Sequence, residues 1–388
     1  MGRVPQRHRN HNRGQLTTGT AVTILRYMLR ALGWGVAGLL TGAFLIGYAA
    51  PYLPPASFWW TNLFAVLLPP LGLAVGLLGL GLFGQGLYRR QWGRVVVSAV
   101  LLGLVAVRFA PHVSGGGASA ANGETLRLMT FNVPMSFARQ EASARALGRF
   151  VQREAPDALA LQESWMTTGA SPWSGREARS WPPKVFLVDS LGYAPPQAHP
   201  RQTAICQPVL GRFPLDSIGV HSLPPDGGPG WCSGYTRTRF TWQGRPAVLY
   251  NVHLHTIGTV RPWKRSERWG SLDRWRAFLR TYREGALHRA RQARLIRRRI
   301  EQETHPVLVA GDFNSTPHQW AYRHIAQGLQ GVGLRGKTFP AHRPLVRIDH
   351  LLAGPAWEVV AARVPDPNVE VPISDHRPVT ARLRWRGD

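Results

Sequence analysis

No charged residue occurs between Arg30 and Arg89, and this uncharged stretch restricts what the first part of the chain can fold into. A helix that crosses a bilayer needs roughly 20 apolar residues, so the stretch has room for more than one crossing. The pattern predicts one span at about residues 31–50 and a second at about residues 58–82, separated by a proline-rich turn at residues 51–55. We expect Pro69 and Pro70 to kink the second span.

A third apolar run covers residues 95–107, between Arg94 and Arg108. It is close to the shortest length that spans a bilayer, but the two arginines at its ends can extend their charged groups to the lipid surface. An interfacial or buried helix is the alternative. The choice decides the topology, because three spans place the rest of the chain opposite the N-terminus and two spans place it on the same side.

Basic residues orient the spans. All ten basic residues before Glu124, the first acidic residue, are arginines, and most lie ahead of the first span or at residues 89–94. Loops rich in arginine stay in the cytoplasm. We therefore expect a basic cytoplasmic N-terminus at residues 1–30 and a membrane region of about three helices at residues 31–110. The protein would be a multi-pass protein of the cell membrane, with the remaining chain extracytoplasmic.

The composition changes after a run of small residues that predicts a flexible linker at residues 111–123. Residues 124–388 hold all 21 acidic residues and all but ten of the 47 lysines and arginines, which leaves this part with a net charge of +16. About 265 residues suffice for one large core. Cys206 and Cys232 both lie here, either as a disulfide of an oxidising compartment or as two free buried thiols.

Hydrophobic periodicity in this second part predicts an α/β fold. A strand at residues 126–131, an amphipathic helix with Leu147 and Val151 on its apolar face, and a strand at residues 157–162 come first. Alternating strands on either side of Gln243 and Gly244 form a predicted hairpin. A helix at residues 287–302 leads into a strand at residues 306–311, and two further strands follow. Two packed mixed sheets flanked by helices, an α/β sandwich, fit this order.

Six short stretches place a polar residue at or just after the end of an apolar run. They contain Asn132 (TFNV), Glu163 (LQES), Asn251 and His253 (NVHLH), Asp312 and Asn314 (GDFN), Asp349 (RIDH), and Asp375 and His376 (SDH). Strand ends are where an open sheet offers its side chains to a ligand. A single Asp or Asn after a strand is usually a turn residue, but six such stretches together indicate a site.

Residues 126–383 resemble the endonuclease/exonuclease/phosphatase superfamily, and the most specific pieces are GDFNSTP at 311–317 and SDHRP at 374–378. The resemblance implies a two-sheet α/β sandwich (DNase I-like) as a catalytic domain at residues 124–388. It also implies divalent-metal-dependent hydrolysis of a phosphodiester.

Under this resemblance each residue has an expected role. Glu163 and Asp375, with Asn132, would hold Mg²⁺ or Mn²⁺, which prefer oxygen ligands. Asp312 would take a proton from water, and Asp349 would pair with His376. Phosphate would be held by Asn314, His253, His376 and Asn251, with either histidine able to protonate the leaving group. The alternative for Asn251 is that it only bonds the backbone. Arg212, in a GRFPL stretch where many members carry a tyrosine, would also reach the phosphate, unless it is a solvated surface arginine.

Three functions fit these observations. The first is a membrane-anchored, metal-dependent phosphodiester hydrolase that is nuclease-like, the second a phospholipid (sphingomyelinase-like) phosphodiesterase, and the third a non-catalytic phosphate-binding sensor. An insert rich in arginine and tryptophan at residues 256–291 suits nucleic acid, anionic headgroups or a solvated helix. The substrate is therefore expected to be nucleic acid or a lipid headgroup, and no obligate protein partner is inferred.

Overall fold

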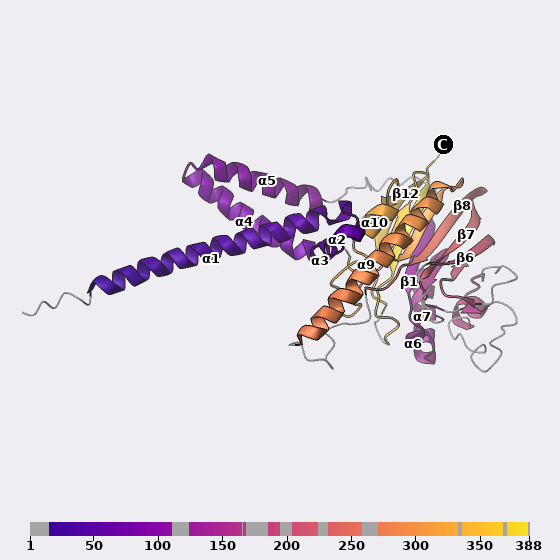
Figure 1. Ribbon diagram of the computed structural model, residues 1–388. Coiled ribbons are helices and arrows are strands. Elements are labelled where there is room, and N and C mark those ends of the chain that lie inside the picture. The colour runs from indigo at the N-terminus through magenta and orange to yellow at the C-terminus, as the bar shows by residue number, and fades with distance from the viewer. Residues whose placement is uncertain are drawn as a thin grey trace, which may run out of the picture. The chain divides into compact units, whose positions relative to one another are not determined.

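The computed structural model describes residues 15–110, 124–164, 166–167, 185–194, 204–223, 232–257, 271–332, 336–367 and 371–386 (Figure 1). The predicted linker at 111–123, the first 14 residues and the centre of the basic insert at 258–270 lie outside the described residues. The chain divides into two compact units. One holds Met1–Ile46 and Leu67–Ala110, and the other holds Gly47–Val66 and Pro111–Asp388. We call the second the catalytic unit, after the role that the family resemblance implies for residues 124–388.

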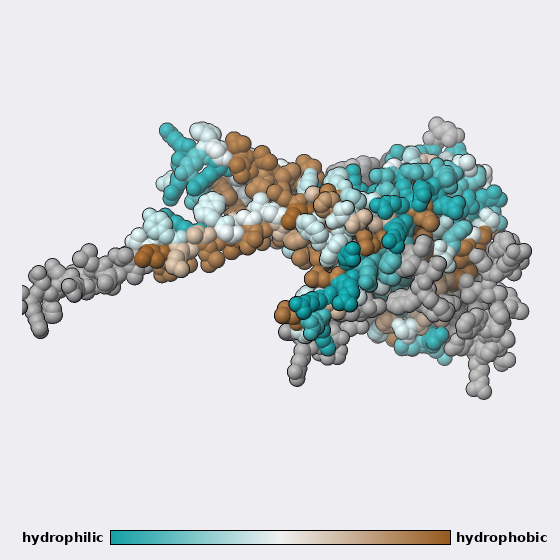
Figure 2. All heavy atoms as spheres, viewed as in Figure 1, coloured by the Kyte–Doolittle hydropathy of each residue, from teal (hydrophilic) through white to brown (hydrophobic). Residues whose placement is uncertain are grey.

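Three helices of the first part are long and apolar enough to cross a membrane. They are α1 (Gln15–Ala49), α4 (Leu68–Tyr88) and α5 (Trp92–Phe109), and the candidate spans cover Val22–Tyr52, Leu68–Tyr88 and Trp92–Phe109. Apolar residues cover much of their surface (Figure 2). Three candidate spans match the predicted number. The predicted range 95–107 lies within α5, which also includes the flanking Arg94 and Arg108.

The second predicted span begins too early. The chain after α1 forms a short 3-10 helix, η1 (Ala50–Tyr52), and two short helices, α2 (Pro55–Phe58) and α3 (Thr61–Val66), before α4 starts at Leu68. The predicted kink at Pro69 and Pro70 is wrong, because both prolines lie in the first turn of α4. A proline there disturbs no helical hydrogen bond, since the first amides of a helix have no partner within it.

Helices α4 and α5 pack closely through small residues. A side-chain carbon added at Gly72 would lie 2.4 Å from the ring of Phe109, and one at Gly79 would lie 3.1 Å from Leu102. Small residues let two helices approach without a hydrophobic driving force, which lipid does not supply. The pair therefore forms an antiparallel helical hairpin.

The catalytic unit is built on two large mixed sheets. The five-stranded sheet has the order β12-β13-β1-β2-β5, and the six-stranded sheet has the order β10-β11-β9-β8-β7-β6. The strands of the first are β1 (Leu126–Asn132), β2 (Ala158–Gln162), β5 (Val209–Gly211), β12 (Trp357–Arg363) and β13 (Val379–Trp385). Those of the second are β6 (Leu215–Ser222), β7 (Gly234–Trp242), β8 (Arg245–His253), β9 (Val307–Asp312), β10 (Gln330–Gly331) and β11 (Asp349–Ala353).

Helices cover the outer faces, so the unit has four layers (Figure 1). Alternate residues such as Leu128 in β1 and Leu249 in β8 form the core between the sheets, while Phe131 packs outward with residues of α7 (Glu141–Glu154). The helices α9 (Leu272–Glu301) and α10 (Trp320–Ile325) cover the six-stranded sheet. The remaining elements are small: α6 (Met135–Ala138), a π-helix (Val185–Ser190), and the pair β3 (Met166–Thr167) and β4 (Ala204–Ile205). The predicted sandwich is confirmed.

The predicted hairpin is confirmed, with Gln243 and Gly244 both at positive φ between β7 and β8. The helix predicted at 287–302 begins earlier, at Leu272, because the arginines and aromatics of the insert continue the amphipathic pattern.

The segment Gly47–Val66, between the first two candidate spans, is part of the catalytic unit. Its η1 packs against α10 and its α2 packs against α9. The side-chain amide of Gln319 donates a hydrogen bond of 3.3 Å to the backbone oxygen of Asn62, and the guanidinium of Arg323 lies 4.1 Å from the ring centroid of Tyr52. A stretch that reads as membrane-associated by composition is therefore also a packing partner of the sandwich.

Candidate active site

The polar residues singled out in the sequence meet where several strands end at one edge of the sandwich. β1 ends at Asn132, β8 at His253 and β9 at Asp312, and Asp349 begins β11. Strand pairing places Asp312 opposite both His253 and Asp349. Gly311 permits this arrangement, because a side-chain carbon at its φ of +144° would lie 1.8 Å from the backbone oxygen of Val252.

Asp312 is the centre of the group. One carboxylate oxygen accepts the backbone N–H of Asn314 at 2.8 Å, and the other accepts the side-chain amides of Asn132 at 3.0 Å and Asn314 at 3.3 Å. The second oxygen also lies 3.7 Å from Nε2 of His253 and 4.0 Å from Nε2 of His376. Three donors hold a nearly fully buried carboxylate in one orientation, facing two imidazoles.

The surroundings of Asp312 make it a stronger base than an ordinary aspartate. Burial raises its pKa, and the carboxylate of Asp349 adds to the effect, while His376 and His253 oppose it; the net result is a pKa of about 6. A carboxyl group with this pKa is ionised at neutral pH and accepts a proton more readily than one exposed to water.

His376 has the opposite disposition. Its Nδ1 donates to the buried carboxylate of Asp349, at 3.1 and 3.0 Å from the two oxygens. Burial disfavours the imidazolium, but the carboxylates of Asp349 and Asp312 outweigh this and raise the pKa of His376 to about 10. The ring also packs on Phe339, with centroids 4.9 Å apart. At neutral pH Nε2 therefore carries a proton and faces Asp312.

His253 is held by the disulfide region. Its Nδ1 donates to the backbone oxygen of Cys232 at 2.9 Å, which leaves Nε2 facing Asp312 and, at 3.6 Å, the carboxylate of Glu163. Cys232 is joined to Cys206 by a disulfide, so the first of the two alternatives for the cysteines holds. A single hydrogen bond, from His253 to Cys232, therefore links the disulfide to the site.

Oxygen atoms suited to a divalent cation are present at the same edge. The side-chain amide of Asn132 donates to Glu163 at 3.2 Å as well as to Asp312, so its oxygen points elsewhere. Among the described side chains, the buried Oδ1 atoms of Asn132 and Asp375 have no hydrogen-bond partner. Glu163 is 39% exposed. Two buried oxygens without a donor and a nearby accessible carboxylate fit a hard ion such as Mg²⁺.

A second group of potential ligands overlaps this one. One ligand atom each from Asp312, Asp349 and His376 lies within 4.8 Å of the others, and all three residues are buried. Most of their lone pairs and protons are already used in the hydrogen bonds described above. Few positions on these three residues therefore remain for a metal ion.

Two residues predicted to contact the substrate, Arg212 and Asn251, have other partners in the structure. Arg212 follows β5, which runs antiparallel to β2. Its backbone N–H donates to the backbone oxygen of Asp157, which precedes β2, whereas Glu163 follows the other end of that strand. Asn251 is fully buried between the sheets, where its amide bonds Gln162 and the backbone oxygens of Leu161 and Pro208. Both therefore have structural roles.

Asn314 lies beside the site, but both hydrogens of its side-chain amide are used within the protein, by Asp312 and by the backbone oxygen of Leu254 at 3.1 Å. In this structure its role is to orient Asp312. Its φ of 46° is left-handed, a conformation that asparagine tolerates better than most residues.

Two contributors were not predicted. Ser374 accepts the backbone N–H of His376 at 2.9 Å and donates to the backbone oxygen of Asn132 at 2.6 Å, which ties the SDH stretch to the end of β1. Gln162 bridges Thr130 and Asn251, linking the two sheets under the site. In the sequence, Ser374 and Gln162 are marked only by their positions next to Asp375 and Glu163.

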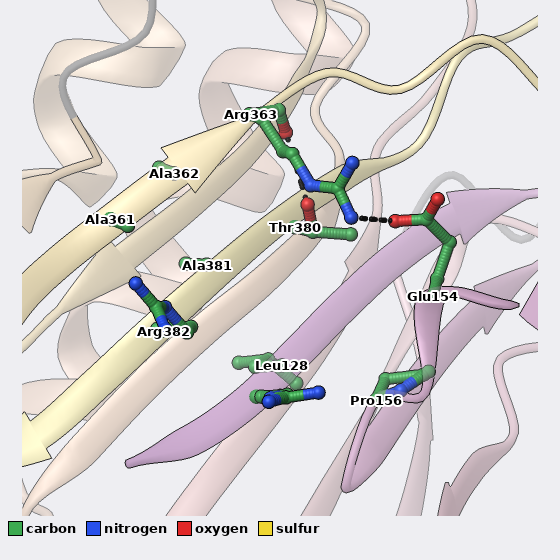
Figure 3. A pocket seen from close by; sticks show the side chains of 10 residues that line it. Leu128, Glu154, Pro156, Ala361, Ala362, Arg363, Thr380, Ala381 and Arg382 are labelled. Atoms are coloured by element: carbon green, nitrogen blue, oxygen red, sulfur yellow. Dashed lines mark hydrogen bonds and ion pairs between the residues drawn. The ribbon is translucent and has the colours of Figure 1, made fainter.

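The described surface also has a hollow away from these residues. It lies on the outer face of the five-stranded sheet, beside the end of α7, and is lined by residues that include Arg363, Glu154 and Thr380 (Figure 3). Arg363 pairs with Glu154 across it. Pro156 in its wall precedes β2, so the hollow is nearer the start of that strand than the end that carries Glu163.

Comparison with known proteins assigns the family. The model of the endonuclease/exonuclease/phosphatase family matches residues 129–376, which include every residue of the group described above. The chain belongs to this family. Membership makes the protein a hydrolase of phosphoric esters, the class that contains the nucleases and phosphatases after which the family is named.

The chain is also similar to solved structures, over about two thirds of its length. The endonuclease/exonuclease/phosphatase of Beutenbergia cavernae is 19% identical with a TM-score of 0.44, covering 68% of this chain and 72% of its own. The protein from Bacteroides vulgatus is 19% identical with a TM-score of 0.44, at 68% and 100% coverage. Sphingomyelinase C of Streptomyces griseocarneus is 16% identical with a TM-score of 0.42, at 67% and 99% coverage. None of the curated proteins matches the sequence.

Proposed function

We propose that the protein is a membrane-anchored hydrolase of phosphodiesters that depends on a divalent metal. The observation that carries this proposal is the pairing of Asp312 with His376: one buried group has a pKa of about 6 and the other a pKa of about 10, and they face each other at 4.0 Å. Environments that push two titratable groups apart in this way assign a base and an acid that both work at neutral pH.

The proposed reaction uses these two groups in sequence. Asp312 takes a proton from a water molecule as its oxygen attacks phosphorus. The bond from phosphorus to the leaving oxygen breaks, and His376 supplies a proton to that oxygen from Nε2. Asp349 keeps His376 charged until this step, and Asn132 and Asn314 keep Asp312 oriented. His253, whose Nε2 lies 3.7 Å from the same oxygen of Asp312, holds the phosphate.

A divalent ion would be held by Glu163 and Asp375, with the side-chain oxygen of Asn132. Bound there, it would neutralise the negative charge that grows on the phosphate during the reaction. The buried oxygens of Asn132 and Asp375 without a donor support this assignment. All of these ligands are oxygen atoms, so the ion stays predicted to be Mg²⁺ or Mn²⁺.

The pH dependence of turnover tests the two assigned roles. We expect kcat/KM for a dialkyl phosphodiester, followed by phosphorus NMR, to rise as Asp312 loses its proton near pH 6 and to fall as His376 loses its proton near pH 10. Asp349→Asn removes a carboxylate that raises both pKa values, so both limbs should move to lower pH. Asp216→Asn, on the distant strand β6, is the control. Limbs that stay in place in Asp349→Asn would contradict the assignment.

We also propose that all three candidate spans cross the membrane and that the catalytic unit is extracytoplasmic. The segment Gly47–Val66 packs against α9 and α10, so the loop after the first span and the catalytic unit lie on one side. If α5 did not cross, they would lie on opposite sides and this contact would be impossible. The arginines at residues 89–94 and the disulfide, which persists in oxidising compartments, support the same orientation.

Reporter fusions test this topology. Alkaline phosphatase fused after Ala120 in a bacterial host should be active, and the same enzyme fused after Arg90 should be inactive, because it folds only outside the cytoplasm. A fluorescent protein that matures only in the cytoplasm should give the reverse pattern. Equal phosphatase activity at the two positions would show that α5 does not cross.

A further inference from the structure

Exposed apolar side chains of the catalytic unit gather in two adjoining places. Among its described residues, the large exposed ones are Tyr52, Phe58 and Trp60 in the segment Gly47–Val66, and Leu272, Trp275 and Leu279 in the first half of α9, with Leu345 apart from them in sequence. The segment and the helix adjoin, because α2, which ends at Phe58, packs against α9, and Gln319 bonds both Asn62 and Tyr282. Tyr52 lies at the α10 side of the segment, where Arg323 covers one face of its ring. We call these six side chains the apolar surface.

The apolar surface lies at the edge of the sandwich that carries the active site. β8 ends at His253, and the residues that follow it bond to the middle of α9: Arg289 donates to the backbone oxygens of His255 and Thr256, and Gln292 accepts the N–H of His255. From Arg289 toward Leu272 the helix runs on for about 25 Å, at 1.5 Å a residue. Because β8 and β9 are parallel and α9 joins them, this projecting half lies beyond the strand ends (Figure 1).

The segment Gly47–Val66 reaches the same edge. Gln319 donates to the backbone oxygen of Asn62 and to the hydroxyl of Tyr282 in the projecting half of α9. Its side-chain oxygen accepts the N–H of Thr316, four residues after Asp312. The segment, the helix and the loop that follows the catalytic aspartate are thus connected by one buried side chain.

The charge pattern of the projecting half suits the surface of a bilayer. Leu272, Trp275 and Leu279 recur at intervals of three and four residues and so share one face of the helix. Arg276, Arg280 and Arg283 are exposed beside them and outnumber the exposed acids Asp273, which pairs with Arg276, and Glu284. An apolar stripe flanked by arginines fits the boundary where acyl chains meet phosphate headgroups.

The connectivity of the chain indicates that a membrane contacts the apolar surface. Gly47–Val66 joins α1 to α4, and both are candidate spans, so each end of the segment lies at a membrane surface. Aromatic residues such as Tyr52 and Trp60 are enriched at that depth. A nucleic acid would use the arginines and Trp275 but would leave Leu272 and Leu279 in water.

We propose that the apolar surface docks on the headgroup layer of the protein's own membrane and presents the active site to phosphodiesters carried by lipid headgroups. The choice of substrate rests on the proposed phosphodiester hydrolysis, whereas the docking rests on the surface alone. Leu345 is a further exposed apolar side chain close to the active site. Its N–H donates to the backbone oxygen of Phe339, and the ring of Phe339 packs on His376.

Docking is tested without turnover by a fluorescent label. The full chain is reconstituted in vesicles of phosphatidylcholine and phosphatidylglycerol, with an environment-sensitive dye on Leu272→Cys, on Leu279→Cys or, as a control, on Gln302→Cys at the far end of α9. The two native cysteines are paired and do not react. Dyes at 272 and 279 should emit at shorter wavelength and be quenched by brominated lipid chains, while the dye at 302 should not. Emission typical of water at 272 and 279 would overturn the proposal.

Substrate choice is tested by the variant Leu272→Ser/Trp275→Ser/Leu279→Ser in the same vesicles. Its turnover of vesicle phospholipid relative to that of soluble bis(p-nitrophenyl) phosphate should fall at least about tenfold, since only the lipid must be reached by docking. Arg291→Ser/Gln302→Ser, in the second half of α9 and directly after its end, should leave the ratio unchanged. An unchanged ratio in the triple variant, or a selective loss on DNA or RNA, would overturn the lipid assignment. Wild-type protein inactive on the soluble diester would instead refute the proposed function.

Discussion

Replacement of Asp312 by Asn should lower phosphodiester turnover about a thousandfold, the scale of a lost general base, while substrate binding is kept or strengthened. The substitution preserves shape and removes the group that takes the proton from water. It also removes a negative charge that faces an anionic substrate. Turnover is measured on bis(p-nitrophenyl) phosphate, and binding by titration with a slowly hydrolysed phosphorothioate diester.

The fold must be monitored in this variant, because Asn132 and Asn314 both donate to the carboxylate of Asp312. An amide nitrogen in its place leaves a donor without an acceptor, at a cost of about 1–3 kcal/mol. Thermal unfolding by circular dichroism shows whether the variant is folded at the assay temperature, and Asp216→Asn is the matched control. Turnover by a folded Asp312→Asn protein at the wild-type rate would exclude Asp312 as the base.

Replacement of Glu163 by Gln should lower the affinity for the activating cation about a hundredfold or more, because one ligand loses its charge. In the wild type a chelator should abolish turnover, and added Mg²⁺ should restore it. In Glu163→Gln, restoration should need a much higher concentration of Mg²⁺. Calorimetric titration with Mg²⁺ measures the affinity without turnover.

Glu141→Gln is a matched control, because Glu141 is exposed on α7 and pairs only with Arg145 among the described contacts. Equal Mg²⁺ affinity in Glu163→Gln and Glu141→Gln would remove Glu163 from the ligand set. Full turnover by the wild type in excess chelator would contradict the metal requirement itself.

The location of the site could be predicted because the ends of strands can be recognised in the sequence as the ends of apolar runs. Asp312 follows an apolar run, and Asn132 and His253 lie at the ends of others, so one edge of a sandwich collects all three. The pairing of Asp349 with His376 came from the family resemblance and is confirmed by their hydrogen bond.

The predicted phosphate contacts of Arg212 and Asn251 failed because they depend on the direction of a strand and on contacts between residues far apart in the chain. Arg212 also follows a strand, but β5 runs antiparallel to β2, so that end faces away from the site. Asn251 occupies an inward-facing position of β8, and whether an inward amide meets a substrate or a second sheet depends on what packs opposite. Periodicity within one strand contains neither kind of information.

The segment Gly47–Val66 is the clearest case of this limit. Its composition is that of a turn between two membrane helices, and the sequence assigns it to the membrane region. Its packing partners, such as Gln319 and Arg323, lie more than 250 residues later. Local pattern cannot report such a contact, yet this contact supports both the topology and the docking proposed here.

The most direct test of the proposed function is phosphorus NMR of the purified full-length chain with a simple phosphodiester and Mg²⁺, run beside Asp312→Asn. The wild type should convert the diester signal into that of a phosphomonoester, stop when chelator is added and resume when Mg²⁺ is returned, while Asp312→Asn leaves the diester intact. A diester signal that persists with the folded wild type and Mg²⁺, or disappears equally fast with Asp312→Asn, would contradict it.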